Sequence, residues 1–242
     1  MFQTAIVIGA SSGIGEQIVR KLAARGTKVA AVARRMDRLQ DIANDWPDLV
    51  LPYAHDVMDY ESAPDLYDQM LQDLGGKLDL FIYNAGVMPT VEEGEWNWDK
   101  DRLMLEVNLL GAVRWINLVG GTMEAARHGT LVGVSSVAGD RGRRGSPVYT
   151  VSKAGLTAHM EAMRNRLDRY GVKVVTAKPG PVRTDMTAGM KLPLMIEAHQ
   201  AAEGILNLAE SGTGSGYVPK TWAPIMNVIQ LVPSFIFRKT NI

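Results

Sequence analysis

Cysteine is absent from this 242-residue chain, which excludes disulfide bonds and thiolate chemistry. The formal net charge is zero, with 26 basic and 26 acidic residues. The composition therefore lacks the basic excess that is typical of nucleic-acid-binding proteins, and we predict no nucleic-acid partner and no metal site. The sequence shows no apolar run of about 18 residues, the length that a transmembrane helix needs. The first apolar run starts at Thr4, which leaves no room for a signal peptide. We therefore expect a soluble cytoplasmic protein.

No linker rich in proline or serine, internal repeat or low-complexity tract divides the chain. We expect a single domain over residues 1–242, with residues 221–242 as an apolar C-terminal extension. Apolar runs alternate with helical patterns, which predicts an α/β fold with a doubly wound parallel sheet and helices on both faces. Strands are expected near residues 4–8, 28–33, 49–53, 78–82, 130–134, 172–177 and 216–218.

A glycine-rich turn joins the first expected strand to a helical pattern. Its glycines allow the backbone to approach a pyrophosphate closely, and the following helix N-terminus supplies free N–H groups and a positive dipole end. A strand, such a turn and a helix in this order predict a dinucleotide site in a Rossmann-type sheet. The candidate cofactor-binding residues here are Gly9, Ser11, Ser12, Gly13, Ile14 and Gly15.

A tyrosine and a lysine lie four residues apart at Tyr149 and Lys153, with Ser136 thirteen residues upstream of the tyrosine. Four residues are about one helical turn, so the phenol and the ammonium would share a helix face. A neighbouring cation favours the phenolate and eases release of the phenol proton. The alternative interpretation is a chance pair on a helix surface, and the glycine-rich turn argues against it.

The Gly-x-x-x-Gly-x-Gly spacing together with the Tyr-Lys pair resembles the short-chain dehydrogenase/reductase family over about residues 4–220. Further motifs of that family follow the later expected strands in the same order. They are Asp56-Val57, Asn84-Ala85-Gly86, Asn108 ahead of Gly111, Ser135 to Gly139, and Pro179 to Thr184.

The resemblance implies an oxidoreductase whose catalytic residues are Ser136, Tyr149, Lys153 and Asn108. Tyr149 would donate or accept the proton of the substrate oxygen, Lys153 would lower the pKa of Tyr149 and hold the nicotinamide ribose, and Ser136 would orient the substrate oxygen. Ser135 is the competing serine. Asn108 would support a proton-relaying water, and the alternative is a helix-interior amide bonded to its own backbone.

The resemblance also implies a set of cofactor contacts beyond the glycine-rich turn. An adenine contact is expected from the pair after the third strand, and the motif after the fourth strand would line the cofactor channel. Thr184 would close over the nicotinamide carboxamide, and it could also cap a following helix. The cofactor-binding residues implied in this way are Asp56, Val57, Asn84, Ala85, Gly86, Tyr149, Lys153, Pro179, Gly180, Val182 and Thr184.

The end of the second expected strand indicates the type of nicotinamide cofactor. NAD sites usually place an acidic residue there to bind the ribose 2′-hydroxyl, and this chain has Ala33 followed by Arg34 and Arg35. A guanidinium can bind a 2′-phosphate with two hydrogen bonds. We therefore predict NADP(H) over NAD, with Arg34 as the main contact and Arg35 as the secondary one. The alternative is that both arginines begin a solvated helix.

Three further segments bear on the substrate. Residues 184–199 carry Met186, Met190 and several other apolar residues, which either contact an apolar substrate or pack the loop onto the core. Residues 140–145 contain three arginines that either bind an anionic group or lie in a solvated loop. Residues 222–237 predict a short amphipathic helix and a tail that covers the substrate cleft or an oligomer interface, or contacts a membrane peripherally.

The arginine-rich loop and the apolar tail together resemble, more loosely, reductases of polyprenyl-phosphate-linked keto-sugars. That resemblance implies a small-molecule or lipid-linked carbonyl substrate. The family resemblance also implies a homodimer or homotetramer, formed through helices around residues 108–123 and 151–170. Two alternative functions remain open at this point: an NAD-linked alcohol dehydrogenase acting on a steroid or acyl substrate, and a cofactor-sensing binding protein without turnover.

Overall fold

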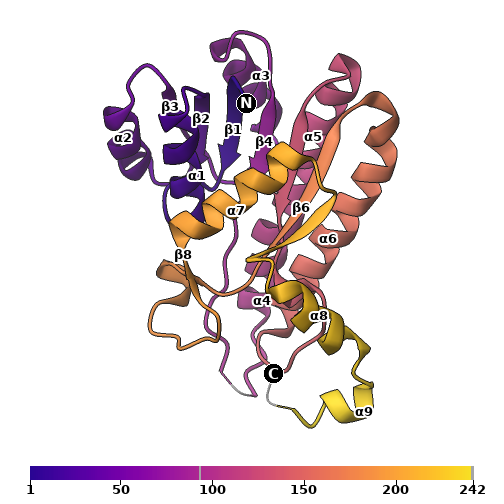
Figure 1. The fold of residues 1–242 in the computed structure, drawn as a ribbon. Coiled ribbons are helices and arrows are strands. Elements are labelled where there is room, and N and C mark those ends of the chain that lie inside the picture. The colour runs from indigo at the N-terminus through magenta and orange to yellow at the C-terminus, as the bar shows by residue number, and fades with distance from the viewer. Residues whose placement is uncertain (93, 241–242) are drawn as a thin grey trace.

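A computed structural model describes residues 1–92 and 94–240. Its centre is a parallel sheet of seven strands in the order β3-β2-β1-β4-β5-β6-β9 (Figure 1). The expected fold class is therefore confirmed. The strands are β1 (Thr4–Ile8), β2 (Lys28–Ala33), β3 (Val50–Ala54), β4 (Leu80–Tyr83), β5 (Thr130–Val134), β6 (Lys173–Pro179) and β9 (Ser215–Val218).

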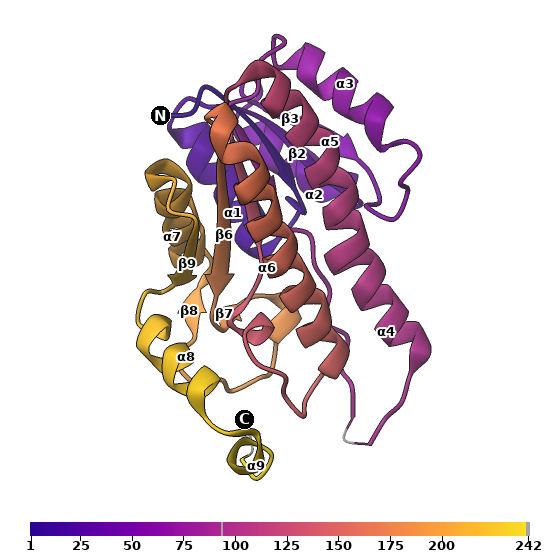
Figure 2. The same ribbon diagram turned by 90° about the vertical axis from the view of Figure 1, so that its right-hand side faces the viewer.

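Helices cover both faces of this sheet (Figures 1 and 2). Successive side chains of a strand point to opposite faces, so Ala5 and Val7 pack with α1, α2 and α7, whereas Ile6 and Ile8 pack with α3, α5 and α6. The helices are α1 (Gly13–Ala24), α2 (Met36–Asp45), α3 (Ala63–Asp73), α4 (Trp98–Leu105), α5 (Gly111–Ala126), α6 (Pro147–Leu167), α7 (Ala198–Ser211), α8 (Trp222–Leu231) and α9 (Ser234–Phe237).

The strand order reverses between β1 and β4, because the chain builds outward to β3 and then returns to the other side of β1. In sheets of this type the crevice at the reversal, beyond the carboxyl ends of the strands, is where ligands bind. Ile8 of β1 lies between Val32 of β2 and Tyr83 of β4, so the segments that follow these three strands begin side by side. The fold thus brings the motifs that follow these strands to one edge.

Several element boundaries differ from the sequence expectation. β4 begins at Leu80 rather than 78, because the Asp79 carboxylate accepts hydrogen bonds from the backbone N–H groups of Gln3 and Thr4. A two-stranded ladder of β7 (Val182–Arg183) and β8 (Ile196–Glu197) was not predicted, since two residues are too few for a hydrophobic pattern.

The C-terminal segment forms two helices, α8 and α9, instead of one helix and an irregular tail. They are separated at Val232 and Pro233, where Val232 is extended with ψ of 124°. The residue before a proline is disfavoured in the helical region, and proline itself lacks an N–H group. Both helices lie close to the end of the sheet that carries the motifs (Figure 2).

One continuous helical stretch, Trp98–Ala126, joins α4 to α5 through a π-helical turn at Glu106–Leu110. Its most apolar part has a mean hydropathy of 1.3, which by length and composition would suffice to cross a membrane, contrary to the expectation from apolar runs alone. Half of that part is buried within the protein. Trp115, Ile116 and Val119 are fully buried there, as in a core helix of a soluble protein.

Candidate active site

A cleft of about 1130 Å³ opens beyond the carboxyl ends of the central strands. Gly15 and Asn108, which were predicted to belong to the site, do not line it but lie behind its wall. The other predicted site residues all line the cleft: Gly9, Ser11, Ser12, Gly13, Ile14, Arg34, Arg35, Asp56, Val57, Asn84, Ala85, Gly86, Ser136, Tyr149, Lys153, Pro179, Gly180, Val182 and Thr184.

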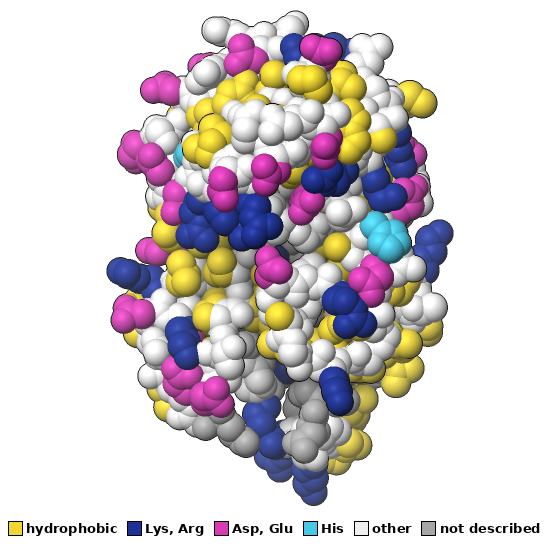
Figure 3. All heavy atoms as spheres, turned by 90° about the vertical axis from the view of Figure 1, so that its left-hand side faces the viewer, with side chains coloured by type: hydrophobic (Ala, Val, Ile, Leu, Met, Phe, Trp, Pro, Cys, Tyr) yellow, Lys and Arg dark blue, Asp and Glu magenta, His cyan; other side chains and the backbone are white. Residues whose placement is uncertain are grey.

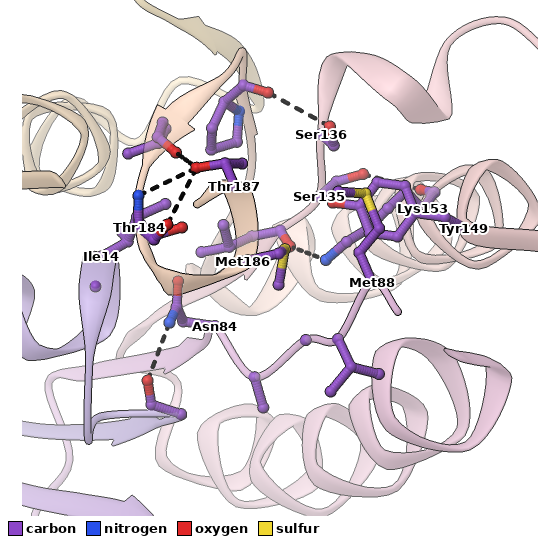
Figure 4. Close-up of a pocket in the computed structure, with 18 of the residues that line it drawn as sticks. Ile14, Asn84, Met88, Ser135, Ser136, Tyr149, Lys153, Thr184, Met186 and Thr187 are labelled. Carbon is purple, nitrogen blue, oxygen red and sulfur yellow. Dashed lines mark hydrogen bonds between the residues drawn. The ribbon is translucent and has the colours of Figure 1, made fainter. Parts of the chain in front are cut away.

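The glycine-rich loop leaves no room for side chains at two of its glycines. Gly9 has a φ of +87°, and a Cβ atom there would lie 2.6 Å from the backbone of Ala85. A Cβ atom on Gly15 would lie 2.0 Å from the carbonyl oxygen of Gly9. The Asn84 side-chain amide donates to that same carbonyl oxygen at 3.1 Å (Figure 4). The loop is therefore held against the strand ends with its backbone facing the cleft, as a pyrophosphate site requires.

The start of α1 is free to receive an anion. Ser12 precedes the helix, but its hydroxyl makes no capping hydrogen bond to the helix backbone. Instead, the Arg35 guanidinium donates to the hydroxyl oxygens of Ser12 at 2.7 Å and Ser11 at 3.0 Å. Among the residues that the structure describes, no side chain accepts a hydrogen bond from the first N–H groups of the helix, which fits a dinucleotide phosphate.

The two arginines after β2 have different surroundings. Arg34 is 61% exposed at its side chain and lies 3.9 Å from the Asp56 carboxylate, the separation of a loose ion pair. Arg35 lies across the glycine-rich loop through its contacts with the two serines. The sequence interpretation ranked Arg34 first, whereas in the structure Arg35 is the arginine in contact with the glycine-rich loop.

The two serines after β5 have separate tasks. The Ser135 hydroxyl is buried and donates to the Lys153 carbonyl oxygen at 2.9 Å, with the Thr157 hydroxyl at 2.8 Å, so it fastens β5 to α6. The Ser136 hydroxyl accepts a hydrogen bond from the backbone N–H of Ala138 at 3.0 Å and donates to the Pro179 carbonyl oxygen at 3.5 Å (Figure 4). Ser136 and Tyr149 both line the cleft. This placement favours Ser136, the serine chosen from the sequence spacing.

Tyr149 and Lys153 both lie on the buried face of α6, as their spacing predicts. The Lys153 ammonium donates to the Val134 carbonyl oxygen at 3.0 Å and lies 5.8 Å from the centre of the Tyr149 ring. Burial lowers the pKa of Lys153 to about 8. Burial raises the pKa of the Tyr149 phenol, against the lowering effects of a hydrogen bond with Ser136 and of the Arg143 charge. This net direction is opposite to the one that the Lys153 charge led us to expect.

Asn108 reaches across to the segment after β4. Its side-chain oxygen accepts from the Val87 N–H at 2.7 Å, and its nitrogen donates to the Val87 carbonyl oxygen at 2.9 Å and to the Ser152 hydroxyl at 3.1 Å. The alternative that this amide bonds only to its own helix is therefore wrong. A Cβ atom on Gly86 would lie 3.5 Å from both the Asn108 oxygen and the Lys153 nitrogen, which places these groups around one point.

Tyr83 and Gly111 accommodate the π-helical turn that carries Asn108. The Tyr83 hydroxyl donates to the Val107 carbonyl oxygen at 2.6 Å, and Tyr83 is fully buried. A Cβ atom on Gly111 would lie 2.7 Å from the Tyr83 hydroxyl oxygen. The spacing from Asn108 to Gly111 thus has a steric cause, because only glycine leaves space for this hydroxyl.

The segment after β6 closes the cleft from the other side. A Cβ atom on Gly13 would lie 3.0 Å from the Thr184 methyl group, so Thr184 contacts the glycine-rich loop. The Thr184 N–H donates to the Thr187 hydroxyl at 3.2 Å in the short helical turn that follows (Figure 4). Thr184 therefore begins a helical turn and lines the cleft as well. Met186 and Met190 also line the cleft and are more than one third exposed, which favours contact with an apolar ligand over packing onto the core.

The apolar C-terminal helices form the outer wall of the same cleft. Trp222, Met226 and Ile229 of α8 and Phe237 of α9 line it. Trp222 packs against Gly180, where a Cβ atom would lie 2.1 Å from the indole nitrogen. This side of the extension covers the cleft, which was one of the alternatives drawn from the sequence. The opposite side exposes Val228, Leu231, Phe235 and Ile236.

Acidic and basic side chains are interspersed over the face shown in Figure 3. This distribution matches the net charge of zero. A single cation on such a surface acts mainly through its immediate contacts, because neighbouring opposite charges and salt screen its longer-range field.

Known proteins resemble this chain over nearly its whole length. The short chain dehydrogenase family matches residues 3–193. An uncharacterized oxidoreductase of Myxococcus xanthus is 37% identical over 207 residues, covering 84% of this chain and 81% of that protein. An uncharacterized oxidoreductase of Mycobacterium tuberculosis is 29% identical over 245 residues, covering 98% and 96%.

Solved structures show the same fold. A short-chain dehydrogenase from Streptomyces avermitilis superposes with a TM-score of 0.84 at 23% identity, covering 94% of this chain and 92% of that one. The structure titled ElxO with NADP bound superposes with a TM-score of 0.80 at 18% identity, covering 90% and 97%. The fold, the cleft and the family match agree: this chain belongs to the short-chain dehydrogenase/reductase family. It is an NAD(P)-dependent oxidoreductase.

Proposed function

We propose that this protein is an NADP(H)-dependent oxidoreductase that interconverts a carbonyl compound and a secondary alcohol. The observation that carries the proposal is the meeting of Ser136, Tyr149 and Lys153 in one cleft with the glycine-rich loop. A nicotinamide cofactor bound there would supply or accept the hydride. Ser136 donates a hydrogen bond to the substrate oxygen, and the Tyr149 hydroxyl transfers a proton to that oxygen during reduction.

Lys153, which lines the cleft, and Asn108, which lies behind its wall, support this proton transfer. Lys153 contributes a buried positive charge beside the Tyr149 ring and a donor for the nicotinamide ribose. Asn108 holds the segment at Val87 in place. Because Gly86 has no side chain, it leaves the space near the Asn108 amide and the Lys153 ammonium open. A water held between these two groups would pass protons from Lys153 to solvent. The other cofactor contacts come from the predicted cofactor-binding residues that line the cleft, of which Gly9 is the first in the chain and Thr184 the last.

The preference for NADP(H) follows from the end of β2. Ala33 occupies the position where an acidic residue would bind the 2′-hydroxyl, and both Arg34 and Arg35 line the cleft. Fluorescence titration with NADPH and NADH tests this preference in wild type, Arg34→Gln and Arg35→Gln. We expect wild type to bind NADPH more tightly, and each variant to lose about tenfold in NADPH affinity with little change for NADH. Equal binding of the two nucleotides by wild type would instead favour an NAD-linked dehydrogenase.

Arg166→Gln is the control for these titrations, because Arg166 is exposed on α6 and does not line the cleft. It makes the same change of charge and side-chain length. Its affinities for both nucleotides should equal those of wild type. A loss in this control as large as that in Arg35→Gln would attribute the effect to net charge and remove the assignment.

Tyr149→Phe separates an enzyme from a cofactor-sensing binding protein. The variant should retain NADPH binding and lose about a hundredfold to ten-thousandfold in turnover of a ketone, because general acid catalysis by one side chain contributes that much. Steady-state absorbance of NADPH measures the rate. Turnover unchanged by the substitution would contradict the role of Tyr149.

We also propose a homodimer or homotetramer, located in the cytoplasm. Leu110 and Val151 support the assembly: they are apolar, 49% and 54% exposed, and belong to the helical segments expected to form subunit contacts. Sedimentation of wild type beside Val151→Glu tests the assembly, and dissociation of the variant is the expected result.

A further inference from the structure

The arginine-containing loop of residues 140–145, which lies between β5 and α6, is anchored at Asp140. The Asp140 carboxylate accepts hydrogen bonds from the Lys178 ammonium at 2.6 Å and from the Tyr217 hydroxyl at 2.7 Å. The Asp140 side chain is only 3% exposed. Burial and the bond to Asp140 raise the pKa of Tyr217 to about 12, so this phenol stays a donor. The start of the loop is therefore fixed relative to β6 and β9.

Arg141, the next residue, joins the loop to the C-terminal helices. Its guanidinium donates to the carbonyl oxygens of Gln230 at 2.9 Å and Val232 at 2.7 Å. The same guanidinium stacks 4.6 Å from the centre of the Phe237 ring. The last carbonyl groups of a helix lack partners within the helix, so Arg141 satisfies the end of α8. The Arg141 guanidinium is therefore already occupied by contacts within the protein.

Arg143 differs from Arg141 in having no such partner. It lines the cleft, and its Nε atom is buried without a hydrogen-bond partner among the described residues. Within residues 1–92 and 94–240, no carboxylate forms an ion pair with Arg143. Burial lowers the pKa of the Arg143 guanidinium, against the opposing effect of the Tyr149 phenol. A partly buried guanidinium without a counter-charge is costly, and an anion in the cleft would offset that cost.

Apolar side chains also line the cleft that Arg143 lines. They include Met88, Val91 and Leu103, together with Met226 and Ile229 of α8. Ligand sites of this kind combine apolar walls with a few polar groups that fix orientation. Arg143 is near enough to Tyr149 for its charge to affect the phenol. An anion on Arg143 and a carbonyl at Tyr149 can thus belong to one small molecule with an apolar body.

We propose that Arg143 binds a carboxylate or phosphate group on the carbonyl substrate and so selects anionic substrates. The proposal depends on the function proposed above only in that the same molecule presents its carbonyl to Tyr149. Arg143 is a specificity-determining residue in this scheme. The guanidinium presents several N–H donors in one plane, which suits two-point contact with either anion.

Two matched pairs of aryl ketones test the proposal. They are para-acetylbenzoate with its methyl ester, and para-acetylphenyl phosphate with para-methoxyacetophenone. Equilibrium binding to the protein saturated with NADP⁺ is measured by calorimetry, up to millimolar ligand, for wild type, Arg143→Gln and the control Arg166→Gln. Saturation with NADP⁺ occupies the phosphate-binding loop, so the added anion reports on the remainder of the cleft.

Wild type should bind at least one anionic ketone about tenfold or more tightly than its uncharged partner. Arg143→Gln should remove that difference and leave the uncharged ketone unaffected, and Arg166→Gln should behave as wild type. The relative losses for the two pairs distinguish a carboxylate from a phosphate. Arg143→Lys should recover part of the preference, since it restores the charge without the planar group.

Three results would overturn the proposal: no saturable binding of either anion, equal binding of the charged and uncharged ketones, or an Arg143→Gln variant that keeps the preference. Rates with NADPH then separate this failure from failure of the proposed function. Reduction of the uncharged ketones by wild type would preserve the carbonyl reductase proposal while removing the anion site. Equal rate losses for charged and uncharged ketones in Arg143→Gln would assign Arg143 an effect on Tyr149 alone.

Discussion

Asp140→Asn should destabilise the protein more than any surface charge substitution. The side chains of Asp140 and Lys178 are 3% and 12% exposed, and their charged atoms lie 2.6 Å apart. Asparagine keeps the shape and an acceptor oxygen for the Tyr217 hydroxyl, but it leaves the Lys178 ammonium without its counter-charge. Removal of one partner from a buried ion pair costs about 3–5 kcal/mol. Since Lys178 retains some contact with solvent, we expect about 3 kcal/mol.

That loss corresponds to a fall in melting temperature of about 6–12 °C for a chain of this length. Urea denaturation followed by circular dichroism gives the free energy of unfolding, and calorimetry gives the melting temperature. Arg183→Gln is the matched control, because the Arg183–Glu197 pair is similarly close at 2.8 Å but has side chains that are 65% and 49% exposed. An exposed pair contributes no more than about 1 kcal/mol.

A double-mutant cycle with Lys178→Met isolates the pair. The double variant Asp140→Asn, Lys178→Met should lose less than the sum of the single variants, because it leaves no unpaired charge. A loss below about 0.5 kcal/mol for Asp140→Asn, or strict additivity in the cycle, would refute the reasoning that this pair is buried and coupled.

Two other substitutions give direct tests. Gly15→Ala should reduce NADPH affinity about tenfold or more, because its Cβ atom would lie 2.0 Å from the Gly9 carbonyl oxygen and must displace the loop. Gly121→Ala is the control, since this helix position has open space, and it should bind NADPH as wild type does in the same titration. Burial disfavours the Asp79 carboxylate, but bonds from His128 and the Gln3 N–H outweigh it and lower its pKa to about 2. The resulting stability is complete above about pH 4, the usual pKa of the unfolded side chain, and is lost as pH falls towards 2. The difference in unfolding free energy between wild type and Asp79→Asn should therefore shrink over that range, and a constant difference would contradict the assignment.

The sheet was predictable because each strand carries its own signal. The run at residues 4–8 is apolar after Thr4, as expected of a strand buried on both faces, and a glycine-rich turn marks its end. The candidate site followed from the same logic. Gly9 and Asn84 directly follow strands, Ser136 is the second residue after one, and Pro179 ends one. Parallel strands bring their carboxyl ends to one edge, so local order in the sequence determines proximity in space.

The remainder depends on contacts between segments far apart in the chain. Nothing around Arg35 indicates that its guanidinium lies on Ser11 and Ser12 rather than in solvent. Asp140 meets Lys178 and Tyr217 only because the β5–α6 loop crosses the ends of β6 and β9. Glycines were identified as loop formers from spacing alone, but the need for Gly111 arises from a hydroxyl 28 positions earlier in the chain, that of Tyr83.

The π-helical turn at Glu106–Leu110 has a consequence for how the gene can vary. Such a turn is one residue longer than the α-helical turn it replaces, so deletion of one codon there would restore a regular helix. The preceding helix would then rotate by about 100° relative to α5. The Asn108 amide and the carbonyl that receives the Tyr83 hydroxyl could not both keep their places. The stretch is therefore constrained in length as well as in residue type, and we expect a deletion there to reduce activity.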